Sequence, residues 1–105
     1  MAATLKTATY VRRLPDLGIS EQRLYKLSTP VEYRSSDLDE EEVQYTSHLI
    51  VSRTTWLNET MAFPARANGT LINLMELNFD SYNQTHTECL ERMGYQVIDN
   101  WHSNG

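Results

Sequence analysis

Val43-Gln-Tyr-Thr-Ser-His-Leu-Ile-Val51 carries the clearest pattern in this chain of 105 residues. The odd positions Val43, Tyr45, Leu49 and Val51 make one mostly apolar side, and the even positions are more polar. Successive side chains of a strand point to opposite faces of a sheet, so this alternation predicts a half-buried strand.

The residues after this strand predict a hairpin over 59–74. Met61-Ala62-Phe63 is a strand candidate, and Pro64 marks an edge or a strand end because proline cannot donate to a strand ladder. Asn68-Gly69 is a strong turn signal, since both residues tolerate positive φ. Thr70-Leu71-Ile72 is then expected to be a third strand.

A short helix and a final strand are expected near the C-terminus. Thr85-His-Thr-Glu88 fits the capping box, in which a threonine hydroxyl and a glutamate side chain satisfy free amides at a helix start. Gly94 suits the left-handed residue that ends a helix. Tyr95-Gln-Val-Ile98 then predicts the last strand, followed by a polar tail from Asp99 to Gly105.

Residues 1–42 are expected to form an arm. The first 19 residues show no sustained period, and Ser20 has the character of a helix N-cap that starts a helix over 21–27. That helix must end before Pro30. Residues 35–42 are polar and acidic, which predicts a solvated linker or, alternatively, a contact for a basic partner.

These elements predict an α+β fold. We expect a mainly antiparallel sheet of three or four strands with one short helix on a face, contained in residues 43–105 and preceded by the arm. A unit of about 60 residues buries little apolar area and is marginal alone. Docking of the arm, or of a partner chain, would therefore be favourable.

Composition excludes several classes of function. The net charge of −5 disfavours nucleic-acid binding, which needs a basic face. Cys89 is the only cysteine, so an intramolecular disulfide is impossible and a cysteine zinc site is disfavoured. No apolar run approaches membrane-spanning length and the N-terminus lacks a signal-peptide pattern. We therefore expect a soluble protein made in a cytoplasm, with no nucleic-acid or membrane partner.

Few residues suggest catalysis. His48, His86 and His102 have no metal-ligand spacing, so we expect no metal site and no cofactor. Cys89 lies near a helix start, where a thiolate could form, but its place on the apolar stripe favours a core residue. No pair of carboxylates is singled out by its spacing, so no catalytic residue is assigned. A small enzyme that uses Cys89 or His86 stays an alternative.

Three stretches carry a resemblance. They are Glu59-Thr-Met-Ala-Phe-Pro-Ala-Arg-Ala-Asn-Gly-Thr-Leu71, Met75-Glu-Leu77 and Gly94-Tyr-Gln-Val97. Together they resemble a family of small uncharacterised proteins encoded by phages of actinobacteria, over residues 43–98. The chain has Leu57-Asn58 where that family has Gly-Pro, and Thr85-His86-Thr87 where it has Asp-His-Glu. The resemblance implies a phage setting and no known activity.

Aromatic residues outside the expected core stripes, Tyr82 among them, suggest protein contacts, because Tyr and Trp are enriched in interfaces. We assign partner binding to seven residues: Tyr10, Arg12, Arg13, Tyr25, Tyr33, Trp56 and Trp101. With the resemblance, this predicts a non-catalytic interaction module, most simply an accessory virion protein, capsid-associated or decorating, in the virion or the host cytoplasm.

In that hypothesis the arm contacts neighbouring protein subunits. These subunits could be further copies of the same chain, which would make a homo-oligomer. A polar arm without a period is normally poorly ordered alone, which favours order through such contacts. An early phage protein that binds and modulates a host factor is the other alternative.

Overall fold

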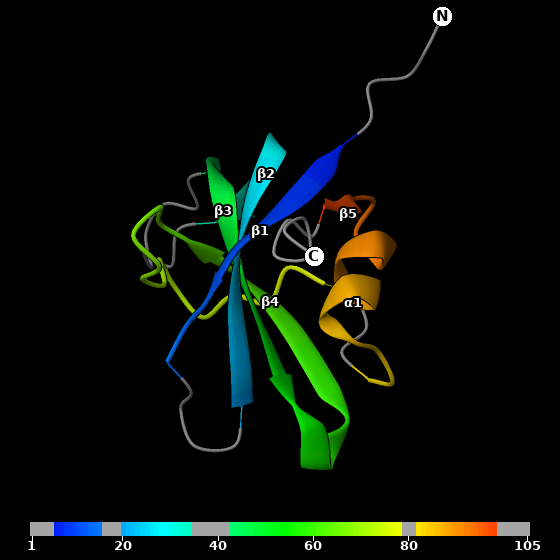
Figure 1. Ribbon diagram of the computed structural model, residues 1–105. Coiled ribbons are helices and arrows are strands. Elements are labelled where there is room, and N and C mark those ends of the chain that lie inside the picture. Colours follow the sequence, from blue (N-terminus) through cyan, green and yellow to red (C-terminus); the bar gives the residue numbers. More distant parts are fainter. Residues whose placement is uncertain (1–5, 16–19, 35–42, 79–81, 99–105) are drawn as a thin grey trace, which may run out of the picture.

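The computed structural model describes residues 6–15, 20–34, 43–78 and 82–98. In chain order its elements are β1 (Thr7–Arg13), β2 (Ser20–Arg34), β3 (Val43–Thr54), the 3-10 turn η1 (Thr55–Leu57), β4 (Glu59–Ala65), α1 (His86–Arg92) and β5 (Gln96–Ile98). The strands form one sheet in the order β4-β3-β2-β1-β5, with α1 beside it (Figure 1). Neighbouring strands are antiparallel, except that β5 runs parallel to β1.

The expected architecture is therefore wrong in two respects. The sheet has five strands and is mixed, rather than three or four mainly antiparallel strands. Two of the strands, β1 and β2, come from the residues expected to form an arm with a helix. The described part of residues 1–42 thus pairs within the chain's own sheet, which removes the structural reason for an arm that reaches a neighbour.

Residues 21–27, expected as a helix, lie inside β2. Tyr25 pairs with Tyr10 of β1 on one side and with Leu49 of β3 on the other. Tyr25 and Leu27 pack in one core cluster and Leu24 packs in a second, which is the alternation of a strand. A helix of seven residues is marginal in water. Hydrogen bonds to β1 and β3 stabilise the strand more than capping by Ser20, the first residue of β2, would stabilise a helix.

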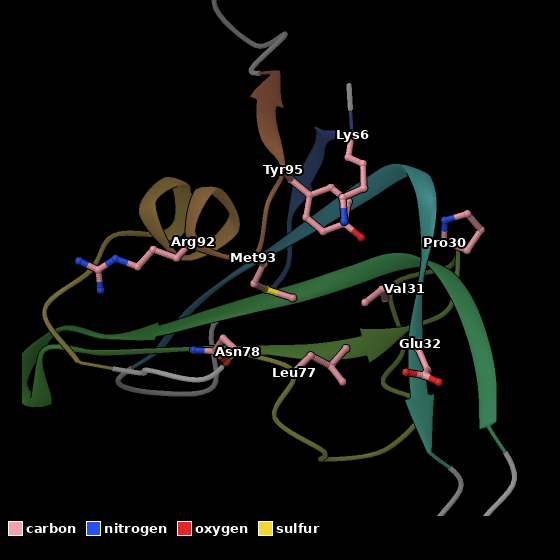
Figure 2. Close-up of a pocket in the computed structure, with 9 residues that line it drawn as sticks. All are labelled: Lys6, Pro30, Val31, Glu32, Leu77, Asn78, Arg92, Met93 and Tyr95. Atoms are coloured by element: carbon pink, nitrogen blue, oxygen red, sulfur yellow. The ribbon is translucent and has the colours of Figure 1, made fainter. Parts of the chain in front are cut away.

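A bulge bends β2 in its middle. Lys26 pairs with His48 and Val31 pairs with Thr46, so the four residues 27–30 stand opposite a single residue of β3. Pro30 lies in this bulge, where its missing amide hydrogen leaves no ladder bond unmade. Figure 2 shows the chain turning at Pro30.

The strand expected over 43–51 is confirmed as part of β3. Leu49 and Val51 are fully buried in the larger core cluster, and Ile50 is buried in the other cluster. The second half of β3 is therefore covered on both faces. Val43 and Tyr45, placed by their alternation on the buried side, are exposed because they lie at the end of the strand away from the core.

The hairpin is confirmed in β4 and its turn but not in its last strand. Gly69 has a φ of +90°, and its amide donates to the Arg66 carbonyl at 3.0 Å. Residues 70–72 were expected as a strand, but Leu71 makes only an isolated bridge to Ala65. The chain then follows the outer edge of β4, where the Leu77 amide donates to the Ala62 carbonyl at 2.8 Å.

The capping box at the start of α1 is confirmed. The Thr85 hydroxyl accepts from the Glu88 amide at 3.1 Å, and the Thr85 amide donates to Glu88 Oε1 at 3.0 Å. Gly94 follows the helix with a φ of +98° and leads into β5, which is also as expected. Among the described residues, no helix has the length and apolar content needed to cross a membrane.

Two hydrophobic clusters stabilise the sheet, one on each face. The larger lies between the sheet and α1 and contains Ala8, Tyr25, Leu27, Leu49, Val51, Ala62, Cys89, Leu90 and Tyr95. The smaller contains Leu14, Leu24, Ile50 and Ala65, with Leu71 packed against it. β2, β3 and β4 contribute to both clusters, and the two long strands β2 and β3 are paired along most of their length.

Candidate functional site

Three exposed large hydrophobic side chains belong to residues at or next to the end of the β3–β4 hairpin. Trp56 and Leu57 lie in η1 and are 68% and 45% exposed. Tyr82, 58% exposed, lies beside this turn because it forms a bridge with Glu59, the first residue of β4. We call Trp56, Leu57 and Tyr82 the aromatic tip.

A network of hydrogen bonds centred on Arg53 fixes the backbone beneath the aromatic tip. One guanidinium nitrogen donates to Thr60 Oγ1 at 3.0 Å and to the Gln84 carbonyl oxygen, and the other donates to Asn58 Oδ1 at 2.8 Å. Asn58 Nδ2 donates to Asn83 Oδ1 at 2.6 Å, and the Asn83 amide donates to the Asn58 carbonyl at 3.0 Å. These bonds tie the segment before α1 to the hairpin.

Two left-handed residues complete the geometry of this end. Asn58 has a φ of +51° and Asn83 has a φ of +59°. Asparagine is the residue that best tolerates this region apart from glycine. Their amide side chains bond to each other, so the two turns hold one another in place. The backbone under the aromatic tip is therefore preorganised while its apolar side chains stay in solvent.

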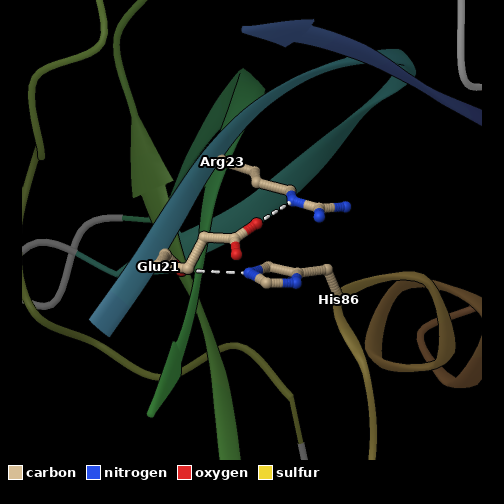
Figure 3. A network of polar contacts seen from close by, with 3 residues as sticks. All are labelled: Glu21, Arg23 and His86. Carbon is tan, nitrogen blue, oxygen red and sulfur yellow. Dashed lines mark hydrogen bonds and ion pairs between the residues drawn. The ribbon is translucent and has the colours of Figure 1, made fainter. Parts of the chain in front are cut away.

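A second polar cluster joins β2 to the start of α1 (Figure 3). Arg23 Nε donates to Glu21 Oε2 at 2.6 Å, and His86 Nε2 lies 3.0 Å from the Glu21 carbonyl oxygen. Because a carbonyl oxygen only accepts, Nε2 carries the imidazole proton. Thr55, Arg53 and Thr87 help to line the hollow of about 270 Å³ around this cluster.

The environment of this cluster shifts two pKa values. Burial lowers the pKa of His86, helped by the positive charges of Arg23 and Arg53 and opposed by its bond to Glu21. Burial raises the pKa of the Glu21 carboxyl, but the hydrogen bond and charge of Arg23 more than offset this, so it falls below its ordinary value. The imidazole is neutral and the carboxylate is ionised at neutral pH.

The features named for the enzymatic alternative have structural roles here. His86 is buried, and its contact is with the backbone of Glu21 rather than with the carboxylate. Cys89 is fully buried in the larger cluster, and burial raises the pKa of its thiol to about 11. A protonated, inaccessible thiol is a poor nucleophile. No group of three His, Cys, Asp or Glu side chains suited to a metal ion occurs within the described ranges.

Two of the residues assigned to partner binding, Tyr25 and Tyr33, are buried and so do not present their side chains to a partner. Tyr25 is 1% exposed, and its ring packs against Tyr10 with the centroids 5.8 Å apart. Tyr33 is buried and donates to Gln44 Oε1 at 2.7 Å. Both were expected outside the core. Tyr25 is buried because β2 lies between β1 and β3 there, whereas Tyr33 lies in the later half of β2, which pairs with β3 alone.

Three of the other assigned residues, Tyr10, Arg12 and Arg13, lie on β1. Arg12 is exposed and donates to the Asn68 carbonyl at 2.9 Å, so it supports the hairpin turn, and Arg13 is exposed at the end of β1. Tyr10 is half-buried under the Arg23 guanidinium. Trp101 lies outside the described residues. Trp56 alone joins the aromatic tip, and the structure does not bring the assigned set together.

Leu57 was missed, and Tyr82 was not connected with Trp56. The two asparagines in left-handed turns give no clear signal in the sequence, and the bridge from Tyr82 to Glu59 spans more than twenty residues. Comparison with known proteins finds no matching family model, no similar curated protein and no similar solved structure.

Proposed function

We propose that this protein is a non-catalytic protein–protein interaction module that binds its partner through the aromatic tip. The observation that carries the proposal is the exposure of Trp56, Leu57 and Tyr82 at one end of the molecule, on a backbone fixed by Arg53.

The chemistry of the aromatic tip suits an interface. Trp and Tyr remove a large area from water at a small cost in side-chain entropy, and both are enriched among the residues that dominate binding energy. A preorganised backbone reduces the ordering cost of association. Contact through the tip replaces the contact by an N-terminal arm, because β1 and β2 are strands of the sheet.

For the setting we propose an accessory phage virion protein, capsid-associated or decorating. The resemblance of residues 59–71, 75–77 and 94–97 to small phage proteins supports this setting. An early phage protein that binds a host factor through the same surface is the second candidate, supported by the same exposed tip. The proposed partners in both cases are protein subunits, and the proposed locations are the virion and the host cytoplasm.

The experiment compares purified virions of the encoding phage carrying the wild-type chain, the double variant Trp56→Ala/Tyr82→Ala, or Tyr45→Ala. Tyr45 is the matched control, because it is 65% exposed on β3 but lies away from the aromatic tip. We expect a stoichiometric band for the wild type and for Tyr45→Ala. The double variant should be reduced about tenfold or more.

Absence of the wild-type chain from virions contradicts the virion setting. A tagged chain is then recovered from infected cells, and loss of one stoichiometric host protein in the double variant alone supports the second candidate. Equal behaviour of the double variant and Tyr45→Ala in both experiments contradicts a role for the aromatic tip. Fast modification of Cys89 by a thiol reagent in the folded protein would revive the enzymatic alternative.

A further inference from the structure

A pocket of about 320 Å³ opens at the C-terminal end of α1, the end away from the capping box. It lies between the bulged half of β2, the C-terminal end of α1 and residues 77–78 (Figure 2). Its volume is at the low end of the range of about 300–1,000 Å³ found for small-molecule sites. It shares no residue with the aromatic tip.

The floor of the pocket is apolar. Val31, Leu77 and Met93 are half-buried and pack against the larger cluster, and the ring of Tyr95 completes the surface. The Tyr95 hydroxyl donates to the Thr29 carbonyl at 3.3 Å, which fixes the ring. Apolar area that is still in contact with water here would be removed by an aliphatic group, which is a favourable transfer.

One positive charge stands over this floor. Lys6 Nζ lies 5.1 Å from the centroid of the Tyr95 ring. Among the described residues, no carboxylate lies within ion-pair distance of Lys6. Arg92 also lines the pocket, but it donates to Gln84 Oε1 at 3.3 Å, and Figure 2 draws its guanidinium pointing away from Lys6. The available cation is therefore Lys6.

We propose that this pocket binds a monocarboxylate with an aliphatic body, whose carboxylate meets Lys6 and whose body covers Val31, Leu77 and Met93. The carboxylate of Glu32 lines the same pocket and disfavours a second negative group on the ligand. Two sources share this chemistry: a free short-chain acid, and the C-terminal apolar residue of a peptide.

The test is a titration of the full chain followed by the methyl NMR signals of Val31, Leu77 and Met93. The probes are hexanoate, its neutral counterpart hexanamide, acetate, and a pentapeptide ending in leucine with either a free or an amidated C-terminus. We expect saturable shifts with hexanoate or with the free-carboxylate peptide, and affinity at least about tenfold weaker for the matching amide. Tighter binding of the peptide than of hexanoate identifies a protein C-terminus as the source, and the reverse identifies a free acid.

Two variants of Lys6 separate charge from packing. Lys6→Gln should weaken binding about tenfold, because the hydrogen bond to a charged group is lost. Lys6→Arg keeps the charge and should bind within about threefold of the wild type. Lys6 is exposed, so both variants should retain the fold, which is checked by their thermal unfolding. The proposal is overturned if neither acid gives saturable shifts, if the amides bind as tightly as the acids, or if Lys6→Gln binds like the wild type.

Discussion

Among single residues, Arg53 makes the hydrogen bonds that connect the segments beneath the aromatic tip. It extends from β3 and donates to groups on β4, on the turn after η1 and on the segment before α1. A guanidinium offers several donors in a rigid plane, so one side chain satisfies acceptors that an ammonium group could not reach together. Arg53 therefore helps to hold the segment that contains Tyr82 against the start of β4.

Replacement of Arg53 by Met, which keeps much of the stem, should lower the free energy of unfolding by about 2–3 kcal/mol, since hydrogen bonds from a charged group are lost. Arg53→Lys should recover only part of this loss. Arg66→Met is the matched control, because Arg66 is exposed and its guanidinium donates to one described group, the Leu71 carbonyl, at 3.0 Å. Urea denaturation measures all three, and equal losses for the variants of Arg53 and Arg66 would contradict the role given to the network.

His86 makes stability depend on pH. Its folded pKa lies below the ordinary value of 6.5, so between these two values the unfolded chain binds more protons than the folded one. Stability should therefore fall as the pH drops below about 6.5, and the loss is complete below the folded pKa. His86→Gln keeps a hydrogen-bond donor but cannot titrate, so its unfolding free energy should change less between pH 7 and pH 5.

The difference between the two pH profiles isolates His86 from other groups. The Glu21 carboxylate has a folded pKa below its ordinary value of 4.5, so its contribution is lost at more acid pH. Burial and the charge of Lys26 also lower the pKa of His48. His48 is present in both the wild type and His86→Gln, so its contribution cancels in the difference between their profiles. Parallel profiles for the wild type and His86→Gln between pH 7 and pH 5 would show that His86 is not the group responsible.

Among the secondary-structure elements, β4 and α1 are each followed by a glycine with positive φ. The two glycines, Gly69 and Gly94, differ in how closely other atoms surround them. Gly69 closes the turn after β4, and a Cβ there would lie 2.7 Å from Arg12 Nη2 and 3.0 Å from Leu14 Cδ2. Gly94 ends α1, and a Cβ there would meet only Lys6 atoms at 3.7 Å. The left-handed conformation is common to both, so the pair separates backbone strain from crowding.

Gly94→Ala should cost about 1–2 kcal/mol, the strain of a left-handed residue with a Cβ. Gly69→Ala should cost about 0.5–1 kcal/mol more, because Arg12 must move and lose its bond to Asn68. Thermal or urea unfolding of both variants gives the comparison. A smaller loss for Gly69→Ala than for Gly94→Ala would contradict the close approach of Arg12 to the turn.

At the scale of the whole molecule, the two N-terminal strands connect the parts of the sheet. β2 lies between β1 and β3, and β1 is the only strand that pairs with β5 in the described sheet. Tyr25 and Leu27 lie in the larger cluster, and Leu24 lies in the smaller one. Residues 43–98 alone would lose the centre of the sheet and part of both clusters.

A fragment that begins at Val43 should therefore fail to fold. We expect no cooperative thermal transition by circular dichroism and poorly dispersed amide signals by NMR for the fragment, whereas the full chain should give a cooperative transition and well-dispersed signals. Addition of a separate peptide spanning 6–34 is the control, since it restores β1 and β2. A sharp unfolding transition for the fragment alone would show that residues 43–105 are an independent domain.

Features that depend only on neighbouring residues can be predicted from the amino-acid sequence. The strand over residues 43–51, the capping box at Thr85, the turn at Asn68-Gly69 and the left-handed Gly94 were predicted and are present. Each is specified within one turn or one strand, because the responsible side chain acts on the backbone a few residues away.

Three features depend on tertiary contacts: the state of residues 20–34, the parallel pairing of β5 with β1, and the bridge that places Tyr82 beside Glu59. Ser20 and Glu21 have the local character of a helix start, but hydrogen bonds to β1 and β3 and burial of Leu24 and Tyr25 on opposite faces favour a strand. Those contributions come from residues far away in the chain. A local pattern cannot encode them, because the energy of a strand is set by the partners on either side of it.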